Sequence, residues 1–598
     1  MQSSPFKIAI VGLGPKGLYG FERILSQLQE NPVKEKVEIH IFNKTRFMGS
    51  GDVYRSDQPG YMLMNFSNKH INMWTEESPP PVVKNPLSLS ECIALEKQTP
   101  LEELEPLYAL RATVGGYLEN GFAQLSQNIP ENVTLQQHIT EVRSIEKTEE
   151  GYSIGFTQQT KTGRLTGFQH ILVSTGHQLH KETASKTIHN TVPFIYPVQQ
   201  KLKGVTEQDT IAVKGMGLTF IDAVLALTEG KGGLFTKAND GKLIYKASGK
   251  EPKQIFPFSK SGWPMMPKYD SHLDDDTELY VKSLKSINPR KLSFKNEILP
   301  LIERDMEYAW YRTLFPHAKQ VLGYHPNYNV ISSQIHIFHQ MHPGYVRFSL
   351  ESLMEPEFNP GKSIHQNIVE YLKAFTRENR NILHEAQLRA ASVWRKISPI
   401  FNEIYSFSGL DAASHKEFDG HYFGKLNRIA YGPPPENLKK ILVLATKGIV
   451  DFQFAKSPSL EPYESGFILR NDISEMYCDV LVDARIPKNS LEKESTGLFT
   501  NLCENQLAQP YINSDQNSSY APGILEIDQN GNLINPQGNP ENITLYGTPT
   551  EGIAHDNDTL FRNRNNFAGP WARAVIDHLI NRTDVVKKST TKTFATTK

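Results

Sequence analysis

"IAIVGLGPKGLYG", residues 8–20, joins an apolar run to three closely spaced glycines and then to a run with helical periodicity. This pattern predicts a buried strand, a tight turn and a helix. Gly12 permits the turn, Gly14 lets a pyrophosphate approach the backbone, and Gly17 allows close helix–strand contact, while the helix N-terminus favours the anion. We therefore predict a dinucleotide-binding site on this loop, which also contains Pro15 and Lys16.

The strand expected after this helix is "VEIHIFNK", residues 37–44. In dinucleotide-binding folds this strand ends in Asp or Glu, whose carboxylate accepts a hydrogen bond from a ribose hydroxyl. Asn43 stands at that place, and its amide oxygen can accept the same bond without a charge. Asn43 is therefore a candidate ribose contact, and a turn-forming asparagine is the alternative.

A second strand–glycine–helix unit begins with "VKGMGLTF", residues 213–220. Gly215 and Gly217 match the start of a nucleotide-binding turn, but Phe220 stands where the third glycine belongs. Leu218 and Thr219 open the helix and belong to the same candidate site. From the residues alone, this loop is a second nucleotide site, a decayed one or a plain turn.

The bulk composition excludes several classes of function. The chain has 598 residues, 38% of them hydrophobic, which predicts several domains with ordinary cores. A net charge of −1 gives no global field for nucleic acid or an anionic membrane. No apolar run approaches the roughly 20 residues of a membrane span, and the N-terminus enters a strand at once, without the layout of a signal peptide. We expect a cytoplasmic protein.

Metal and dithiol chemistry are not expected either. The three cysteines, Cys92, Cys478 and Cys503, form no C-x-x-C pair, and the 19 histidines show no H-E-x-x-H spacing. We predict no metal site.

The order of patterns along the chain predicts an α/β protein with two Rossmann-like domains and a mainly helical insertion. The first domain is split, since strand patterns and a last helix return near the C-terminus. The expected segments are 1–205 for the first part of an FAD-binding domain, 206–275 for an NAD(P)-binding-like domain, 276–465 for the insertion, 466–584 for the return to the first domain, and 585–598 for a disordered tail.

Eight blocks of the chain resemble one family of FAD/NAD(P)-binding proteins, which includes the FAD-dependent urate hydroxylase and the nitrosuccinate-forming L-aspartate N-monooxygenase. More distantly, the layout is similar to that of ornithine and lysine N-hydroxylases. The blocks are "FMGSGDVYRSDQPGYMLMN" (47–65), "LYALRATVGGYL" (107–118), "ILVSTGHQ" (171–178), "GMGLTFIDAVLALTEGKGG" (215–233, Phe220 included), "SGLDAASHKEF" (408–418), "LNRIAYGPPPE" (426–436), "VLVDARIP" (480–487) and "GTPTEG" (547–552).

The resemblance implies FAD in the first domain and a nicotinamide cofactor, NADPH or NADH, in the second. Reduced flavin would activate O₂ to oxygenate a small polar substrate, such as aspartate at its amine or urate at its ring. The cofactor carries the hard chemistry, so no side chain needs to act as nucleophile and no catalytic residue is assigned. The alternatives are a flavin-binding reductase or regulatory protein that does not oxygenate a substrate, and a scaffold with vestigial loops.

The resemblance makes further residues candidate cofactor contacts. Backbone N–H groups of the Gly49–Gly51 turn would meet the flavin phosphates. Arg55 and Arg111 would contact a cofactor or an anionic substrate. The candidates in these blocks are Gly49, Ser50, Gly51, Arg55, Gln58, Arg111, Thr175, Gly176, Gly547, Thr548, Glu551 and Gly552.

The second loop gains a more specific interpretation from the resemblance. Phe220 should keep the helix farther from its strand than in the first unit, which suits a nicotinamide cofactor that exchanges beside an FAD that stays. "KLIYKASGKEP" (242–252) follows as a predicted strand, and Ser248 and Lys250 at its end would hold a 2′-phosphate, which favours NADPH over NADH.

Four residues of the expected insertion lie in family-like blocks but receive no chemistry from the sequence. They are Ser414, His415, Asn427 and Arg428. His415 is either a proton donor or, as we favour, a helix cap or part of a buried hydrogen bond.

Overall fold

The computed structural model describes residues 4–158, 161–177, 190–268, 279–286, 291–376, 378–487, 490–491, 497–562 and 564–595. Its first glycine loop has the predicted context. β1 (Phe6–Val11), α1 (Pro15–Glu30) and β2 (Val37–Asn43) form a βαβ unit, in which β1 and β2 run parallel with Ile8 opposite Ile39.

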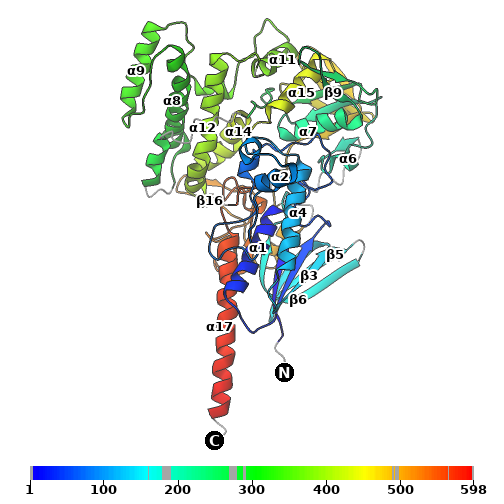
Figure 1. The fold of residues 1–598 in the computed structure, drawn as a ribbon, viewed down its shortest axis with the longest axis vertical. Helices are drawn as coiled ribbons and strands as arrows, with labels where there is room; N and C mark the ends of the chain where they lie inside the picture. Colours follow the sequence, from blue (N-terminus) through cyan, green and yellow to red (C-terminus); the bar gives the residue numbers. More distant parts are fainter. Residues whose placement is uncertain are drawn as a thin grey trace.

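The first sheet extends on both sides of this unit (Figure 1). β3 (Val133–Ile139) pairs with β2, while β6 (Lys161–Val173) pairs with β1 on the other side. β19 (Pro540–Leu545) then pairs with β6, and all these pairs are parallel. The central order is therefore β19-β6-β1-β2-β3, with its outermost strand taken from the C-terminal part of the chain. This confirms the predicted α/β class with a split first domain.

Shorter elements complete the first domain. Antiparallel pairing joins β4 to β5, β5 to the first half of β6, and β18 to β19. α1 contacts both α4 and α17. The remaining elements are β4 (Glu141–Thr148), β5 (Gly151–Gln158), β18 (Asn532–Ile534), α2 (Leu89–Lys97), α3 (Leu101–Leu104), α4 (Arg111–Gln127), α16 (Leu498–Glu504) and α17 (Ala568–Ala595).

A buried ionic network fastens the C-terminal segment to α1. Glu22, which is fully buried, pairs with both Arg23 and Arg562. Arg23 Nη1 also donates to the carbonyl oxygen of Pro79 at 2.9 Å. Because removing one partner of a buried ion pair leaves an uncompensated charge, this network strongly favours the return of the chain to the first domain.

The second sheet is built around the second glycine loop. β8 (Thr210–Lys214) lies between β11 (Gln254–Phe258) and β15 (Val480–Asp483), and both pairs are parallel. β7 (Thr191–Val192) adds beyond β15. α7 (Leu218–Leu227) follows β8 directly, so a second strand–turn–helix unit exists as predicted.

The second sheet shifts two expected domain boundaries. β7 and β15 pair within this sheet, although we expected residues 1–205 and 466–584 to belong to the first domain. The first core contains residues from 6–173 and 498–579, whereas the second contains residues mainly from 195–484. Both expected boundaries differ from the structure, because the residues of short buried strands such as β7 and β15 do not show which sheet the strand joins.

The helices between β11 and β15 share one core with α7. α8 (Leu299–His317) and α12 (Ile382–Tyr405) pack together, and α14 (Phe423–Ala430) packs on α12 (Figure 1). The other helices are α6 (Val198–Lys201), α9 (Tyr328–Met341), α10 (Leu350–Met354), α11 (Ile364–Ala374), α13 (Ala412–Glu417) and α15 (Pro435–Thr446).

Three small sheets and six short helical turns complete the part of the fold that the structure describes. The sheets are β9 (Leu234–Lys237) with β10 (Leu243–Lys246), β12 (Ser459–Tyr463) with β13 (Gly466–Arg470) and β14 (Glu475–Cys478), and β16 (Asn513–Ser514) with β17 (Ser519–Tyr520). The turns are η1 (Asn68–His70), η2 (Glu229–Lys231), η3 (Tyr280–Ser286), η4 (Phe294–Ile298), η5 (Phe418–Tyr422) and η6 (Thr548–Thr550).

The C-terminal tail differs from its expectation. α17 runs beside α1 and continues beyond the sheet to Ala595, although we expected disorder from residue 585 (Figure 1). The polar tail lacks an apolar face, but it directly extends a helix that is already formed, and propagation costs less than nucleation. In the part of the chain that the structure describes, no helix is long and apolar enough to cross a membrane.

Candidate functional site

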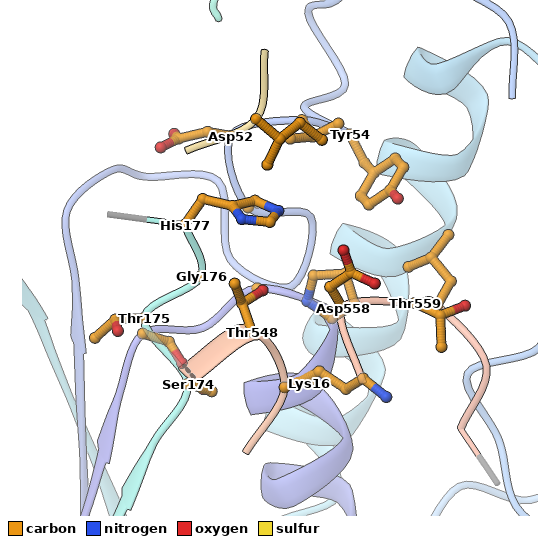
Figure 2. Close-up of a pocket in the computed structure, with 18 of the residues that line it drawn as sticks. Lys16, Asp52, Tyr54, Ser174, Thr175, Gly176, His177, Thr548, Asp558 and Thr559 are labelled. Carbon is orange, nitrogen blue, oxygen red and sulfur yellow. Dashed lines mark hydrogen bonds between the residues drawn. The ribbon is translucent and has the colours of Figure 1, made fainter. Parts of the chain in front are cut away.

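One cavity of about 420 Å³ lies where the two domains meet. It is bounded by the first glycine loop, the end of β6, the start of α7, one face of α14 and the C-terminal turn after β19. Ser174, Thr175 and His177 lie across it from Asp558 and Thr559 (Figure 2). The predicted site residues that line it are Gly12, Gly14, Pro15, Lys16, Asn43, Ser50, Gly51, Arg111, Thr175, Gly176, Leu218, Thr219, Gly547, Thr548 and Glu551.

The first loop leaves room for a ligand at its glycines. Gly12 has φ +88°, and a Cβ on Gly17 would lie 2.2 Å from the Gly12 carbonyl oxygen, so this turn needs both glycines. Gly14 is the N-cap of α1, and a Cβ there would meet only Gly51 Cα, at 3.8 Å. α1 has no side-chain cap and no acidic residue in its first turn, so its N–H groups are available to an anion.

A second observation also agrees with a bound dinucleotide. The Thr175 hydroxyl is buried at the end of β6 without a hydrogen-bond partner. A buried polar group without a partner costs about 1–3 kcal/mol, which a ligand atom can offset. The residues present therefore fit the phosphates and ribose of a dinucleotide.

Asn43 lines the cavity, but its side chain is already engaged. Its Oδ1 accepts from the N–H of Leu13 at 3.0 Å, and its Nδ2 donates to the carbonyl oxygen of Thr45 at 2.9 Å. Asn43 thus stabilises the glycine loop itself. This geometry favours the turn-forming alternative over the ribose contact.

The C-terminal turn places charged groups beside the first loop. Burial lowers the pKa of Lys16 to about 7, against the opposing effects of Asp558 and Glu551. Lys16 Nζ donates to the carbonyl oxygen of Phe561 at 3.1 Å. Burial, followed by the nearby Asp558, raises the pKa of Glu551. Gly552 belongs to the same turn but does not line the cavity.

Arg111 forms an ion pair with Asp222, so its charge is already compensated within the protein. Its Nη2 lies 2.7 Å from Asp222 Oδ2, and both side chains are buried. Tyr196 donates to the same carboxylate and accepts from Arg111 Nη1 at 3.1 Å. Burial alone would lower the pKa of Arg111, but Asp222 and Tyr196 raise it. This cluster joins α4 of the first domain to α7 of the second.

The other candidates of the 47–65 block have local roles. Arg55 pairs with Asp57, with 2.6 Å between Nη2 and Oδ2, and stacks on Phe47, and Gln58 Nε2 donates to the Asp52 carbonyl oxygen at 3.1 Å. Gly49 has φ +96°. None of these three predicted contacts, Arg55, Gln58 and Gly49, lines the cavity. They shape the turn whose Ser50 and Gly51 do line it.

The second glycine loop is more open than the first. Gly215 has φ +110°, whereas a Cβ on Gly217, the N-cap of α7, would have no atom within 4 Å. Phe220 is buried in the second core, with its ring centroid 6.5 Å from that of Phe452. Gly215 and Gly217 lie outside the cavity, and the following Leu218 and Thr219 line it. The exchangeable cofactor stays a prediction.

Ser248 and Lys250 are misplaced for a phosphate. β10, which precedes them, pairs antiparallel with β9 instead of joining the second sheet. The N–H groups of Ser248 and Gly249 donate to the Glu251 carboxylate at 2.8 and 2.9 Å. An acidic side chain therefore already occupies this turn. The parallel neighbour of β8 is β11, which ends immediately before Ser259 and Lys260.

The family-like residues with no assigned chemistry divide into two groups. His415 contacts the Tyr405 hydroxyl at 2.7 Å, and burial lowers its pKa to about 4, so it is neutral at pH 7 and does not line the cavity. Ser414 donates to Asp411 at 3.0 Å. Arg428 binds the backbone, whereas Asn427 lines the cavity.

Several lining residues were missed by the sequence analysis, namely Asn65 as part of the cavity, Tyr196, Phe423, Asn427 and Tyr431. Asn65 and Asn427 stand in family-like blocks, and that was the available signal. The sequence does not show which face of α14 points to the cavity, nor which residues meet between the two domains.

Comparison with known proteins identifies the first domain. Residues 9–178 match a family described as FAD-NAD(P)-binding. This match confirms the predicted cofactor class for the region that carries the first glycine loop.

Relatives along almost the whole chain confirm the resemblance seen in the sequence. Nitrosuccinic acid synthase of Aspergillus oryzae is 24% identical over 91% of this chain and 88% of its own length. An L-aspartate N-monooxygenase (nitrosuccinate-forming) of Streptomyces cremeus is 24% identical over 91% of this chain and 90% of its own.

Solved structures are similar at a lower level. Ornithine hydroxylase from Pseudomonas aeruginosa is 11% identical, covers 96% of this chain and 100% of its own, and has a TM-score of 0.44. A cadaverine monooxygenase from Erwinia amylovora bound to FAD is 11% identical, covers 96% and 95%, and has a TM-score of 0.45.

Gly14→Val tests the dinucleotide site on the first loop. A side chain at Gly14 has room and an ordinary φ of −80°, so the protein should fold, but the branched side chain would enter the cavity. We expect purified Gly14→Val protein to retain little FAD, measured by its visible absorbance, with an unchanged far-ultraviolet circular dichroism spectrum. Gly116→Val is the matched control, because Gly116 is exposed with no atom near its Cβ. Equal FAD content in both variants would contradict the site.

Proposed function

We propose that this protein is an FAD- and NAD(P)H-dependent monooxygenase that acts on a small polar substrate. One observation carries the proposal: the first glycine loop and the start of α7 line the same cavity. Two cofactors held on these loops would have their reactive ends in the same cavity. The relatives that match about nine-tenths of the chain are a nitrosuccinic acid synthase and an L-aspartate N-monooxygenase, which supports this chemistry.

The chain's own residues bind, orient and exclude water. When bound, the cofactors supply hydride and the activation of O₂, so that NAD(P)H, O₂, a proton and substrate give NAD(P)⁺, water and the oxygenated product. Gly12 and Gly14 admit the FAD phosphates, and the buried Thr175 hydroxyl gains a partner. Thr548, Glu551 and Lys16 border the same space from the C-terminal turn.

N-hydroxylation of an amino acid such as aspartate is the sharper form of the proposal, supported by the names of the relatives. Urate-type aromatic hydroxylation is the alternative within the family. A reductase that does not oxygenate a substrate is the alternative outside it. We further propose a cytoplasmic protein without a nucleic-acid or membrane partner, supported by the net charge of −1.

Turnover of the purified, FAD-loaded protein tests the function. We expect NADPH to bleach the flavin without O₂, and aspartate to accelerate NADPH oxidation in air with an N-oxygenated product detected by mass. Ornithine, lysine and urate are the comparison substrates. Bleaching followed by slow reoxidation that no substrate accelerates would favour the reductase, and no bleaching by either nicotinamide would contradict the proposal.

Lys260→Glu tests where a 2′-phosphate binds. Ser259 and Lys260 follow β11, the place where Rossmann folds distinguish NADP from NAD, and Lys260 is exposed. Like-charge repulsion should raise the KM for NADPH about tenfold and leave that for NADH almost unchanged. Lys250→Glu is the matched control, with no expected effect. A larger effect at Lys250 would restore the sequence-based assignment.

A further inference from the structure

Two asparagines, one from each domain, line the cavity. Asn65 follows the Gly-rich segment of the first domain, and Asn427 lies on α14. Neither side chain has a hydrogen-bond partner within the described ranges, although both residues line the cavity. A carboxamide without a protein partner, at the edge of a pocket, is available to a ligand as donor and as acceptor.

The face of α14 that contains Asn427 is directed at the cavity. Phe423, Asn427 and Tyr431 all line it, and a spacing of four residues places them on one side of a helix. Figure 1 shows α14 next to the first domain. The aromatic side chains flank the carboxamide one turn before and one turn after it, and so limit the size of a ligand there.

A neighbouring face of α14 is held to the backbone around it. Arg428 donates to the carbonyl oxygens of Pro264, Leu353 and Met354 at 3.2, 3.0 and 2.9 Å. Its own carbonyl oxygen accepts from the N–H of Met266 at 3.0 Å. Arg428 is thus a positioning residue that fixes the helix turn from which Asn427 projects.

The same segment, Pro264 to Lys268, continues to the other asparagine. Lys268 Nζ donates to the carbonyl oxygen of Asn65 at 2.7 Å and lies 4.1 Å from the centroid of the Phe66 ring. Residues 264–268 therefore connect the backbone of Asn65 to the backbone of α14. The backbone positions from which the two asparagines project are therefore both bonded to one short stretch of chain.

The charges around the cavity restrict the ligand. Among the described residues, three Lys or Arg side chains line it, and each is engaged: Arg111 by Asp222, Lys44 by Glu141 at 2.5 Å, and Lys16 by the Phe561 carbonyl oxygen. None of these three side chains is therefore free to pair with an anionic group of a substrate. A zwitterionic group, which carries no net charge and both donors and acceptors, matches a pair of carboxamides.

We propose that Asn65 and Asn427 together bind the α-amino acid group of the substrate. The amide N–H groups donate to its carboxylate oxygens, and the amide oxygens accept from its amine. This rests on the proposed function and names the substrate class of the same cavity. It assigns recognition to neutral residues, in place of the arginines that the sequence suggested.

Asn65→Leu and Asn427→Leu test the pair in the FAD-loaded, full-length protein. Leucine keeps the branched shape and removes the donors and acceptors. We expect the Kd for radiolabelled aspartate in equilibrium dialysis, and the KM where turnover occurs, to rise about tenfold in each variant. FAD content and the anaerobic rate of flavin reduction by NADPH should stay unchanged. Because neither amide has a protein partner, the thermal midpoint should not fall.

Asn437→Leu is the matched control, since Asn437 is a buried asparagine on α15 that does not line the cavity and has an Oδ1 without a partner. An unchanged Kd in both cavity variants, or an equal rise in the control, would overturn the proposal. The proposal would also be overturned if the wild-type protein bound none of aspartate, ornithine and lysine. It would be overturned as well if the variants bound aspartate normally but lost affinity for urate. Failure of the flavin to bleach with both NADPH and NADH would instead contradict the proposed function, because dialysis needs no turnover.

Discussion

A buried ion pair between Arg111 and Asp222 joins the two dinucleotide-binding domains. Arg111 begins α4, Asp222 lies in the second turn of α7, and Tyr196 bonds to both. Leaving one charge of such a pair unpaired in the interior costs about 3–5 kcal/mol. The pair therefore fixes how the glycine loops face one another, and the cavity between them depends on that orientation.

This arrangement separates structural charge from ligand recognition. Two arginines that could have attracted an anionic substrate form ion pairs within the protein. Arg111 pairs with Asp222, and Arg55 pairs with Asp57. Recognition is left to neutral groups and to backbone N–H donors at the ends of helices. A cavity of this kind favours ligands that bring their own charge balance or that bind through phosphates.

The parts of the fold predicted from sequence are those with local causes. Gly12 and Gly17 each meet a requirement set by neighbouring backbone, while Gly14 leaves open space at the helix N-terminus, so the first βαβ unit follows from one stretch of chain. The family-like blocks likewise contain slightly less than half of the residues that line the cavity.

The errors have a common physical origin in contacts between distant segments. Ser248 was placed at the end of a predicted strand, but that strand, β10, forms a hairpin and β11 is the parallel neighbour of β8. Arg111 was expected to contact a cofactor or an anionic substrate, and its ion pair was not foreseen because the partner, Asp222, lies 111 residues away in the chain. Asn427 was left without a role because nothing local shows which face of α14 meets the other domain.

The central claim is that two cofactors meet in one cavity, with FAD held on the first loop and a nicotinamide cofactor exchanging on the second. Gly217→Trp tests it most directly, since Gly217 has open space beside it and the indole would occupy the approach to α7. The measurement is anaerobic flavin bleaching by NADPH, with bound FAD followed by its absorbance. The account predicts retained FAD that NADPH no longer reduces, and bleaching at the wild-type rate would contradict it.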